Sequence, residues 1–352
     1  MMRVIHQSLF TGLLLLWAGA ASSQGVPRYS SQIELGRALF EDKNLSADRS
    51  VACASCHAEA HAFADSRAVS VGNRGRSGTR NAPSLLDLNL YSSYFWDGRV
   101  KTLEEQMTFP LSSPSEMGLS NSMDVIARVR ESPGYLYAFN TLLGVPPAAL
   151  NISNVISAIS MYERSLKTEP NSLDDYLSGN KSALSTEARE GMQVFQGAAE
   201  CGSCHRLSMQ AAPLTDNDYH SSGIGMHTIA PKLATLVQRL VSLAATQRFQ
   251  AAQTDPDVAA LGRFLVTLDP QDIGKFRTPS LRNVARTAPY MHDGSVGSLE
   301  TAVEIELYYR GRDLGHPIVL SDIEKQALLT FLRALSAPER LSATTSSLQI
   351  LP

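Results

Sequence analysis

The chain has 352 residues, with 31 Lys and Arg against 34 Asp and Glu, and a formal net charge of −3 at pH 7. This length suggests about two domains, since domains mostly contain roughly 100–200 residues. The near-neutral charge, without any block of basic residues, argues against a nucleic-acid-binding protein and against a polybasic membrane-binding one.

The first residues are predicted to form a secretory signal peptide, residues 1–21. Arg3 precedes an apolar run, LFTGLLLLWAGA, and cleavage is expected after Ala20 or Ala21. An uncleaved anchor is the alternative, but a run of about twelve apolar residues is short for a bilayer span. We therefore expect a mature protein without stable membrane insertion in the periplasm, an oxidising compartment.

The four cysteines of the chain form two copies of a C-x-x-C-H motif. The copies are Cys53, Cys56 and His57, and Cys201, Cys204 and His205. Two thiols at this spacing can add to the vinyl groups of a haem, and the histidine then supplies the proximal iron ligand. A redox C-x-x-C would not need the histidine, and a zinc site would draw its four ligands from both pairs. The pattern predicts two covalently bound c-type haems.

One phrase of the sequence occurs twice. FWDGRVKTLEEQ at 95–106 resembles YMHDGSVGSLET at 290–301. A weaker match, GRALF at 36–40 against GMQVF at 191–195, precedes each haem motif. Such repetition predicts an internal duplication, in which two haem domains share one ancestry.

The two copies differ at one informative position. Trp96 lies as far beyond Pro83 as His292 lies beyond Pro279. Apart from Trp17 in the predicted signal peptide, Trp96 is the only tryptophan. An indole between two haems can carry an electron hole from one iron to the other. The alternative is an aromatic residue that only packs at the domain interface.

Helical periodicity dominates the rest of the chain, and no strand alternation is sustained. STEAREGMQVF at 185–195 is a candidate amphipathic helix, and SDIEKQALLTFLRAL begins with a capping box at Ser321–Glu324. Its apolar positions at helical spacing are Ile323, Leu328, Phe331, Leu332 and Leu335. The polar segment 167–185 is a candidate boundary. The predicted fold is all-α, with two cytochrome c-like haem domains at residues 27–170 and 185–340 and long loops.

Several segments together resemble the bacterial di-haem cytochrome c peroxidase and MauG superfamily. The segments are both C-x-x-C-H motifs, RNAPSLLD, FWDGRVKTLEEQ, SPSEMG, LTDNDYHSSGIG, FRTPSLRNVARTAPYMHDG and LYYRG. They span nearly the whole mature chain. The resemblance implies that hydrogen peroxide is reduced at the N-terminal haem of His57. The C-terminal haem of His205 would relay electrons through Trp96 from an external donor.

The resemblance also implies residues for peroxide cleavage and for calcium binding. On the distal side of the first haem, a glutamine and a glutamate of the family match Gln106 and Glu116. Cleaving the O–O bond requires a proton to move between its oxygens, which a carboxylate can achieve. We therefore expect Glu116 to act as acid and base and Gln106 to orient peroxide, although each could be a plain surface residue. The family's calcium ligands fall on Asn81 and on the backbone carbonyls of Thr287 and Pro289, which are the oxygen ligands that calcium prefers.

The distal ligands are expected to differ from those of reductively activated peroxidases. In those proteins a loop histidine closes the first iron, but the matching residue here is Asn73, which predicts an open iron as in MauG. The second haem has a distal methionine in the peroxidases and a tyrosine in MauG. The matching position is Glu306, but LYYRG resembles the family's FYxRG with two extra residues, which favours Tyr308. Tyr309 is a third choice. A tyrosinate would lower the potential and stabilise high oxidation states.

Three functions remain compatible with the sequence. The first is a peroxidase supplied with electrons by a small redox protein, such as cytochrome c or a cupredoxin. The second is a MauG-like enzyme that oxidatively modifies a side chain of a partner protein. The third is a non-catalytic di-haem electron carrier, against which Gln106, Glu116 and Asn73 argue, since a carrier gains nothing from an open iron beside an acid.

Overall fold

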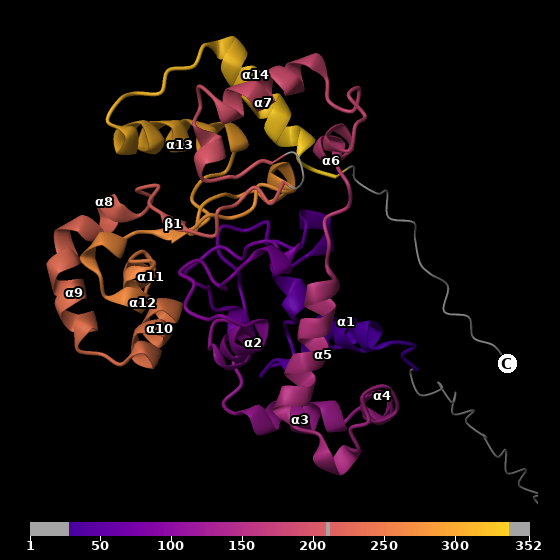
Figure 1. The fold of residues 1–352 in the computed structure, drawn as a ribbon. Coiled ribbons are helices and arrows are strands. Elements are labelled where there is room, and N and C mark those ends of the chain that lie inside the picture. Colours follow the sequence, from indigo (N-terminus) through magenta and orange to yellow (C-terminus); the bar gives the residue numbers. More distant parts are fainter. Residues whose placement is uncertain (1–27, 209–211, 338–352) are drawn as a thin grey trace, which may run out of the picture.

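The computed structural model describes residues 28–208 and 212–337, and the predicted signal peptide lies outside these ranges. Within them the chain is mostly helical with long irregular loops (Figure 1), as predicted. The described residues contain one small sheet, in which β1 (Tyr219–His220) pairs antiparallel with β2 (Phe276–Arg277). Among the helices described, none has the length and apolar character needed to cross a membrane.

The first half is built on a pair of helices. α1 (Gln32–Glu41) begins after Ser31, whose hydroxyl accepts a hydrogen bond from the backbone N–H of Glu34. It packs along α5 (Ile152–Ser165), which is capped by Asn151. The other helices of this half are α2 (Leu103–Ser112), α3 (Ser122–Arg130) and α4 (Pro133–Leu143). The core between them includes Leu35, Leu39, Phe40, Val155 and Ile159.

The second half repeats this arrangement with α7 (Thr186–Gln196) and α14 (Asp322–Ala334), which lie side by side in Figure 1. α7 begins after Ser185 and α14 begins with the predicted Ser321–Glu324 capping box. The remaining helices of this unit are α6 (Ser172–Leu177) and α13 (Leu299–Leu314). Of the apolar residues predicted for the last helix, Leu328, Phe331, Leu332 and Leu335 are buried.

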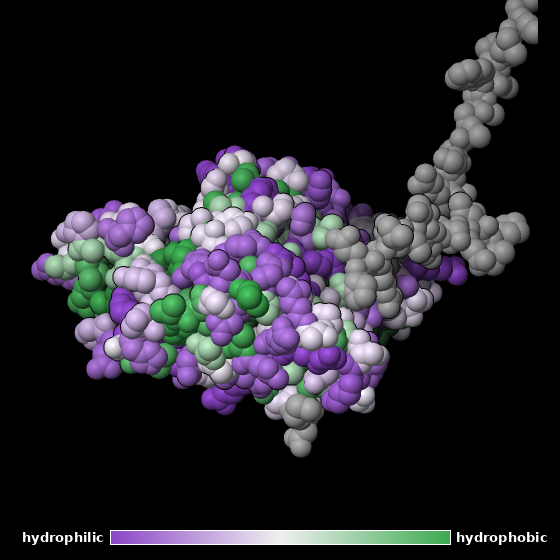
Figure 2. Space-filling model, turned by 90° about the horizontal axis from the view of Figure 1, so that it is seen from above, coloured by the Kyte–Doolittle hydropathy of each residue, from purple (hydrophilic) through white to green (hydrophobic). Residues whose placement is uncertain are grey.

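Ile323 does not share the buried position of the other apolar residues predicted for this helix. Its side chain is 79% exposed, because it lies about 140° around the helix from Leu328, away from the buried stripe. Tyr308 and Val319, in α13 and in the loop that follows it, are also exposed. Figure 2 shows the face of the molecule seen from above, where hydrophobic residues occur as separate groups among hydrophilic ones.

A third group of helices lies between β1 and β2 in the sequence and was not anticipated. Its members are α8 (Met226–Ile229), α9 (Leu233–Val241), α10 (Ala245–Thr254), α11 (Pro256–Ala259) and α12 (Phe264–Thr267). They bury their own core around Leu240, Val258 and Leu261, against which Phe109 of α2 packs. The guanidinium of Arg263 donates hydrogen bonds to the carbonyls of Asp97 and Gly98 at 2.9 and 3.1 Å. This helical insertion therefore contacts the first half directly.

Short 3-10 helices occupy many of the connecting loops. They are η1 (Lys43–Leu45), η2 (Cys53–Ser55), η3 (Glu59–His61), η4 (Asn73–Gly75), η5 (Leu88–Leu90), η6 (Pro147–Ala149), η7 (Cys201–Ser203), η8 (Ala230–Lys232), η9 (Pro270–Asp272) and η10 (Val284–Arg286). Both C-x-x-C-H motifs begin in such a turn.

Within each helix pair, a glycine lets the two helices approach closely, and the two glycines occupy matched positions in the sequence. A Cβ atom on Gly36 of α1 would lie 2.1 Å from the carbonyl oxygen of Ala158 in α5. A Cβ atom on Gly191 of α7 would lie 1.9 Å from the carbonyl oxygen of Ala327 in α14. Edge-to-face ring pairs accompany these crossings, Phe40 with Tyr162 at 5.2 Å and Phe195 with Phe331 at 5.3 Å. Both crossings thus depend on a residue without a side chain.

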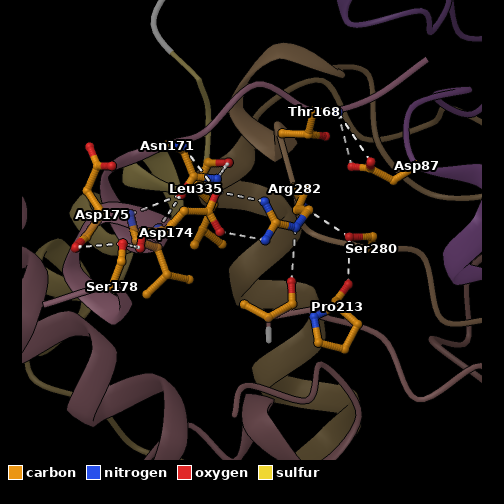
Figure 3. A network of polar contacts seen from close by, with 12 residues as sticks. Asp87, Thr168, Asn171, Asp174, Asp175, Ser178, Pro213, Ser280, Arg282 and Leu335 are labelled. Atoms are coloured by element: carbon orange, nitrogen blue, oxygen red, sulfur yellow. Dashed lines mark hydrogen bonds and ion pairs between the residues drawn. The ribbon is translucent and has the colours of Figure 1, made fainter. Parts of the chain in front are cut away.

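The connection between the halves is held by the polar network of Figure 3. The Asn171 amide donates to the Leu335 carbonyl at 2.9 Å. Arg282 donates to both carboxylate oxygens of Asp174, at 2.7 and 2.9 Å. Leu173, one residue before Asp174, packs into the second core. Most of the segment predicted as a polar boundary is therefore attached to the second half.

Candidate functional site

The first C-x-x-C-H motif presents its histidine in the form that binds a metal. Cys53 opens η2, and the Nδ1 atom of His57 lies 3.0 Å from the carbonyl oxygen of Phe63. Because a carbonyl only accepts, Nδ1 carries the proton, and the lone pair of Nε2 is free for iron. Burial lowers the pKa of His57, so the neutral ring is favoured.

The second motif has the same local design. The Nδ1 atom of His205 lies 2.9 Å from the carbonyl oxygen of Leu214, and burial lowers the pKa of His205. Phe63 and Leu214, whose carbonyls receive these hydrogen bonds, both have positive φ angles, of 58° and 53°. Two separate loops therefore adopt an unusual backbone conformation at the residue that orients each histidine.

A cavity of about 280 Å³ adjoins the second motif. Cys201, Cys204 and His205 line it, and its wall includes apolar side chains of both α7 and α14. Apolar wall residues of the second half are Phe195, Leu299, Ala302, Val303, Leu328 and Leu332. An apolar cavity beside two thiols and an oriented imidazole suits a covalently attached haem.

One face of α13 forms part of the wall of this cavity, so only the α13 residues on that face line the cavity. Leu299, Ala302 and Glu306 line the cavity at the spacing of three to four residues that one helix face requires. Tyr308 lies about 200° around the helix from Glu306 and is 68% exposed. The ring of Tyr309 instead packs beside Gly223, away from this wall. Because the helix continues without the offset that LYYRG suggested, Tyr308 faces away from the cavity and Glu306 faces it.

Glu306 has an unusual environment for a carboxylate. It retains accessible surface where it borders the cavity, while the surrounding protein raises the pKa of its carboxyl group to about 7. The charge of His220 opposes this shift and Asp313 adds to it. A substantial fraction of Glu306 is therefore neutral near pH 7.

Glu116 lies in the loop after α2 and is fixed by the loop that contains Asn73. The backbone N–H of Asn73 donates to the carbonyl oxygen of Glu116 at 2.8 Å. Asn73 is only 3% exposed, and its amide nitrogen, when oriented toward Asp48, lies 3.2 Å from that carboxylate. Burial raises the pKa of Glu116, while the charge of Arg99 and a hydrogen bond from Ser113 lower it. The side chain of Asn73 faces Asp48, to which its amide nitrogen donates in the favoured orientation of the amide.

The charge of Glu116 acts on the first haem motif. It raises the pKa of both Cys53 and Cys56, although burial is the main cause at each thiol. Gln106 is half-buried on α2, one turn into the helix that Thr102 caps. The predicted acid thus lies close enough to the first motif to influence its thiols.

The chain matches a family of haem enzymes. The model of the di-haem cytochrome c peroxidase family matches residues 30–182. The cytochrome-c peroxidase IdrP1 of Pseudomonas sp. (strain SCT) is 34% identical over 332 residues, covering 90% of this chain and 83% of that protein. The cytochrome c peroxidase Ccp of Escherichia coli (strain K12) is 30% identical, covering 89% of this chain and 60% of that protein.

Two further matches come from the MauG branch. The methylamine utilization protein MauG of Methylorubrum extorquens is 29% identical, covering 88% of this chain and 80% of that protein. The crystal structure of a MauG-like protein associated with microbial copper homeostasis superposes with a TM-score of 0.72 at 31% identity, covering 89% of this chain and 91% of that one. This chain belongs to the di-haem cytochrome c peroxidase family. It is accordingly a peroxidase of the oxidoreductase class with two c-type haems.

Trp96 of this peroxidase lies where its two halves meet. Its indole N–H donates to the carbonyl oxygen of Asn81 at 2.9 Å, and the backbone N–H of Arg277 donates to the carbonyl oxygen of Trp96 at 2.7 Å. The backbone N–H of Asn81 donates to the carbonyl oxygen of His292 at 2.8 Å. The His292 ring stacks on Phe276, with centroids 3.6 Å apart. Trp96 and His292 both line the cavity of the second haem.

The residues expected to bind calcium come together at the same cavity. Asn81, Thr287 and Pro289 all line it. The Asn81 amide nitrogen donates to the carbonyls of Arg67 and Ala68 at 3.3 and 3.2 Å, so the amide oxygen points elsewhere. The oxygen atoms of these residues are of the type that calcium prefers, so the calcium site stays a prediction.

Another group of possible metal ligands belongs to the haem attachment. Cys204, Asp216 and His220 lie within 4.8 Å of one another, which marks them out among the described residues. The Nε2 atom of His220 lies 2.9 Å from Asp216 Oδ2. Because the sulfur of Cys204 is needed for the thioether bond to haem, the group does not form an independent metal site.

Sequence reasoning missed a buried ion cluster beside Trp96. Asp97 is fully buried, with Arg80 and Arg99 at 2.7 and 2.8 Å. The Arg99 guanidinium lies 3.6 Å above the centroid of the Phe95 ring. These contacts fix Arg99, whose charge influences Glu116. The segment FWDGR shows Arg99 two residues after Asp97, whereas Arg80 lies 17 residues before it.

Glu163 was also missed. It is 3% exposed, its Oε2 atom has no hydrogen-bond partner, and burial raises the pKa of its carboxyl group to about 8. Its charge raises the pKa of Cys53, so it too lies near the first motif. Within α5 it continues the buried stripe of Ile156 and Ile159 at helical spacing, a polar interruption that was visible in the sequence.

Proposed function

We propose that this protein is an exported peroxidase that reduces hydrogen peroxide at the haem bound by His57. Electrons from an external donor pass first through the haem bound by His205 and then through Trp96. The main support is the half-buried Glu116, whose charge reaches the thiols of the His57 motif and whose raised pKa suits proton transfer. The bound haem irons supply the electron-transfer chemistry that protein side chains lack.

The side chains of this chain then have distinct tasks. Glu116 accepts a proton from the incoming peroxide and returns it to the departing oxygen, so that two electrons and two protons convert one peroxide into two waters. The charge of Arg99 stabilises the ionised form of Glu116 between these transfers. Gln106 orients the peroxide by hydrogen bonding. Trp96 connects the sites, since both its polar groups are fixed by residues of the two halves.

The second haem is proposed to meet Glu306 on its distal side, in place of Tyr308. Glu306 lines the cavity on the same helix face as Leu299 and Ala302, which supports this choice. An oxygen ligand, like the tyrosine expected from the sequence, would favour the oxidised state of the iron. Calcium bound by Asn81, Thr287 and Pro289, and a periplasmic location, complete the proposal.

The two halves are further proposed to descend from one duplicated unit. Support comes from reciprocal hydrogen bonds at matched positions, from Asn81 to His292 and from Arg277 to Trp96. The glycine crossings of the two helix pairs recur in the same way. Phe63 and Leu214 likewise share the same backbone conformation and the same role.

A second candidate function is oxidation of a side chain in a partner protein, as in the MauG branch. It is favoured by Asn73, whose side chain is turned toward Asp48 and offers no imidazole to the first iron. In this case the electrons come from the partner and not from a cytochrome c or a cupredoxin.

One experiment separates these functions. One equivalent of hydrogen peroxide is added to the resting diferric protein without reductant, and both haems are followed by absorbance and electron paramagnetic resonance. Rapid loss of both ferric signals supports an open first haem and directs the search to a protein substrate. Reaction only after one electron is supplied supports a closed first haem and a cytochrome or cupredoxin donor. No reaction under either condition would refute the peroxidase proposal.

A further inference from the structure

Arg277 is a buried cation without an acidic partner. It is 6% exposed, and its Nε and Nη1 atoms are inaccessible to solvent and make no hydrogen bond within the described residues. Its guanidinium instead lies 3.6 Å from the centroid of the Tyr91 ring. A guanidinium removed from water is costly unless an anion or several hydrogen-bond acceptors compensate for it.

The neighbouring arginine of the same cavity shows what a satisfied guanidinium looks like here. Arg282 also lines the cavity, but it forms a two-point ion pair with Asp174 and donates to the carbonyl of Ala212 at 3.0 Å. Arg277 has no such carboxylate. Among the described residues, therefore, no carboxylate compensates the charge of Arg277.

The backbone fixes Arg277 at the boundary between the halves. It lies in β2 opposite Tyr219, and its N–H donates to the carbonyl of Trp96. Arg277 lines the cavity together with His205. Counted from Pro279 and Pro83, its matched residue in the first half is the neutral Asn81. Only the second of the two matched sites therefore carries this cation.

We propose that Arg277 is the anchor of a carboxylate in the cavity of the second haem, and that this carboxylate is a haem propionate. A planar guanidinium pairs with a carboxylate through two parallel hydrogen bonds. Neither a neutral amide nor the ammonium group of lysine can form this two-point pair. Haem supplies its own carboxylates, so no further ligand is required. The inference rests on the second haem at His205 and is independent of the peroxide chemistry.

A functional consequence follows from the charge. A fixed positive charge near an iron favours the reduced form, which carries less positive charge, and so raises the reduction potential. The matched residue of the first half is Asn81, so the first haem has no counterpart of this cation at that position. Arg277 thus makes the two haems electrically unequal, although their histidine loops are built alike.

The test compares three variants of the full-length, haem-loaded protein. Arg277→Gln removes the charge, Arg277→Lys retains it, and Arg248→Gln is a matched control. Arg248 is also buried, at 7% exposure, but it donates to the carbonyls of Leu243 and Leu265 and lies in α10, outside the cavity. The readouts are the haem stoichiometry, the midpoint potential of each haem by spectroelectrochemistry and the thermal unfolding midpoint.

We expect Arg277→Gln to lower the potential of the second haem while that of the first stays unchanged. Arg277→Lys should keep most of the wild-type potential, and Arg248→Gln should lower thermal stability without moving either potential. An unchanged second-haem potential in Arg277→Gln, with both haems bound, would overturn the proposal. Should Arg277→Gln lose the second haem, its retention in Arg277→Lys supports the anchor and its loss in both variants counts against it.

A further measurement identifies the source of the anion. The second-haem potential of the wild-type protein is measured with added chloride or acetate at constant ionic strength. A potential that is independent of these anions supports the propionate. A potential that follows their concentration would assign the site to a free anion and reject the propionate. Neither measurement uses peroxide, so failure of the peroxidase proposal is detected separately.

Discussion

Burial and charge act in opposite directions on the carboxyl group of Glu116. Burial raises its pKa, whereas Arg99 and Ser113 lower it, and burial is the largest effect. A carboxyl group whose pKa is moved toward neutrality can both accept and return a proton during one reaction. Asn73 holds the loop of Glu116 in place through the backbone.

Replacing Glu116 with glutamine should slow peroxide cleavage by roughly 10²–10⁴-fold, because an amide cannot carry the proton. Stopped-flow absorbance of the diferric protein with peroxide measures the rate, and pyridine haemochrome analysis should find both haems retained. Glu131→Gln is the control, since Glu131 is exposed and pairs with Arg49. A wild-type rate in Glu116→Gln would remove Glu116 from the mechanism.

Glu163 gives a pH-dependent contribution to stability. Burial raises its pKa from the ordinary value of 4.5 to about 8 in the folded protein. The folded state therefore binds more protons than the unfolded state between these values, and stability falls as pH rises through this window. Below the window the contribution is fully present, and above it the contribution is lost.

Glu163→Gln should remove this dependence, because the amide stays neutral in both states. Thermal unfolding at several pH values should show the variant gaining on the wild type from about pH 5 to 8, by a few kcal/mol at most at the rate of ~1.4 kcal/mol per pKa unit. A constant difference between the two proteins over that range would contradict a neutral buried Glu163.

Glu306 and Tyr308 make opposite predictions on one helix. Glu306→Ala should change the absorbance and paramagnetic resonance spectra of the second haem, because this residue borders its cavity. Tyr308→Phe should leave both spectra unchanged, since Tyr308 is largely exposed. The reverse pattern would restore the tyrosine inferred from LYYRG.

At the level of elements, the helix pairs α1 with α5 and α7 with α14 are the rigid frame of each half. Gly191 allows α7 to approach the Ala327 carbonyl so closely that any side chain would collide with backbone. Gly191→Ala should therefore destabilise the protein by roughly 1–3 kcal/mol, the usual cost of overpacking. Chemical denaturation measures this, with Gly297→Ala as control, because a Cβ at Gly297 meets nothing within 4 Å. Equal stability of both variants would contradict the close crossing.

Features encoded by neighbouring residues were predictable from the sequence. The capping box of α14, the start of α7 after Ser185 and both C-x-x-C-H turns depend on residues a few positions apart. Tyr308 stays a prediction from motif matching, and the 100° rotation per residue of a continuous helix places it on a different face from Glu306.

Features that depend on residues far apart in the sequence could not be predicted. The pairing of Arg80 with Asp97, the unsatisfied guanidinium of Arg277 and the insertion α8 to α12 follow from contacts between more distant segments. The buried stripe of α5 indicated the position of Glu163, but the burial of Asp97 and Arg277 is decided only when distant segments meet.

In the whole molecule, Trp96 is hydrogen-bonded to Asn81 of the first half and to Arg277 of the second, and we propose that it relays electrons between the haems. Trp96→Phe should delay the response of the second haem to peroxide by at least ~10-fold, which corresponds to ~1.4 kcal/mol of barrier. Rapid-mixing absorbance of both haems measures the delay, and Tyr308→Phe serves as an exposed aromatic control. Simultaneous oxidation of both haems in Trp96→Phe would show that another route connects them.

The insertion of α8 to α12 gives the peroxidase a second attachment between its halves. The chain passes from the first core to the second near Asn171, yet Arg263 at the start of α12 also grips the carbonyls of Asp97 and Gly98, and Phe109 of α2 packs into the insertion core. The halves are therefore held together at two places, the covalent connector and the insertion. Together these two attachments restrain the distance between the haems, on which the speed of electron transfer depends.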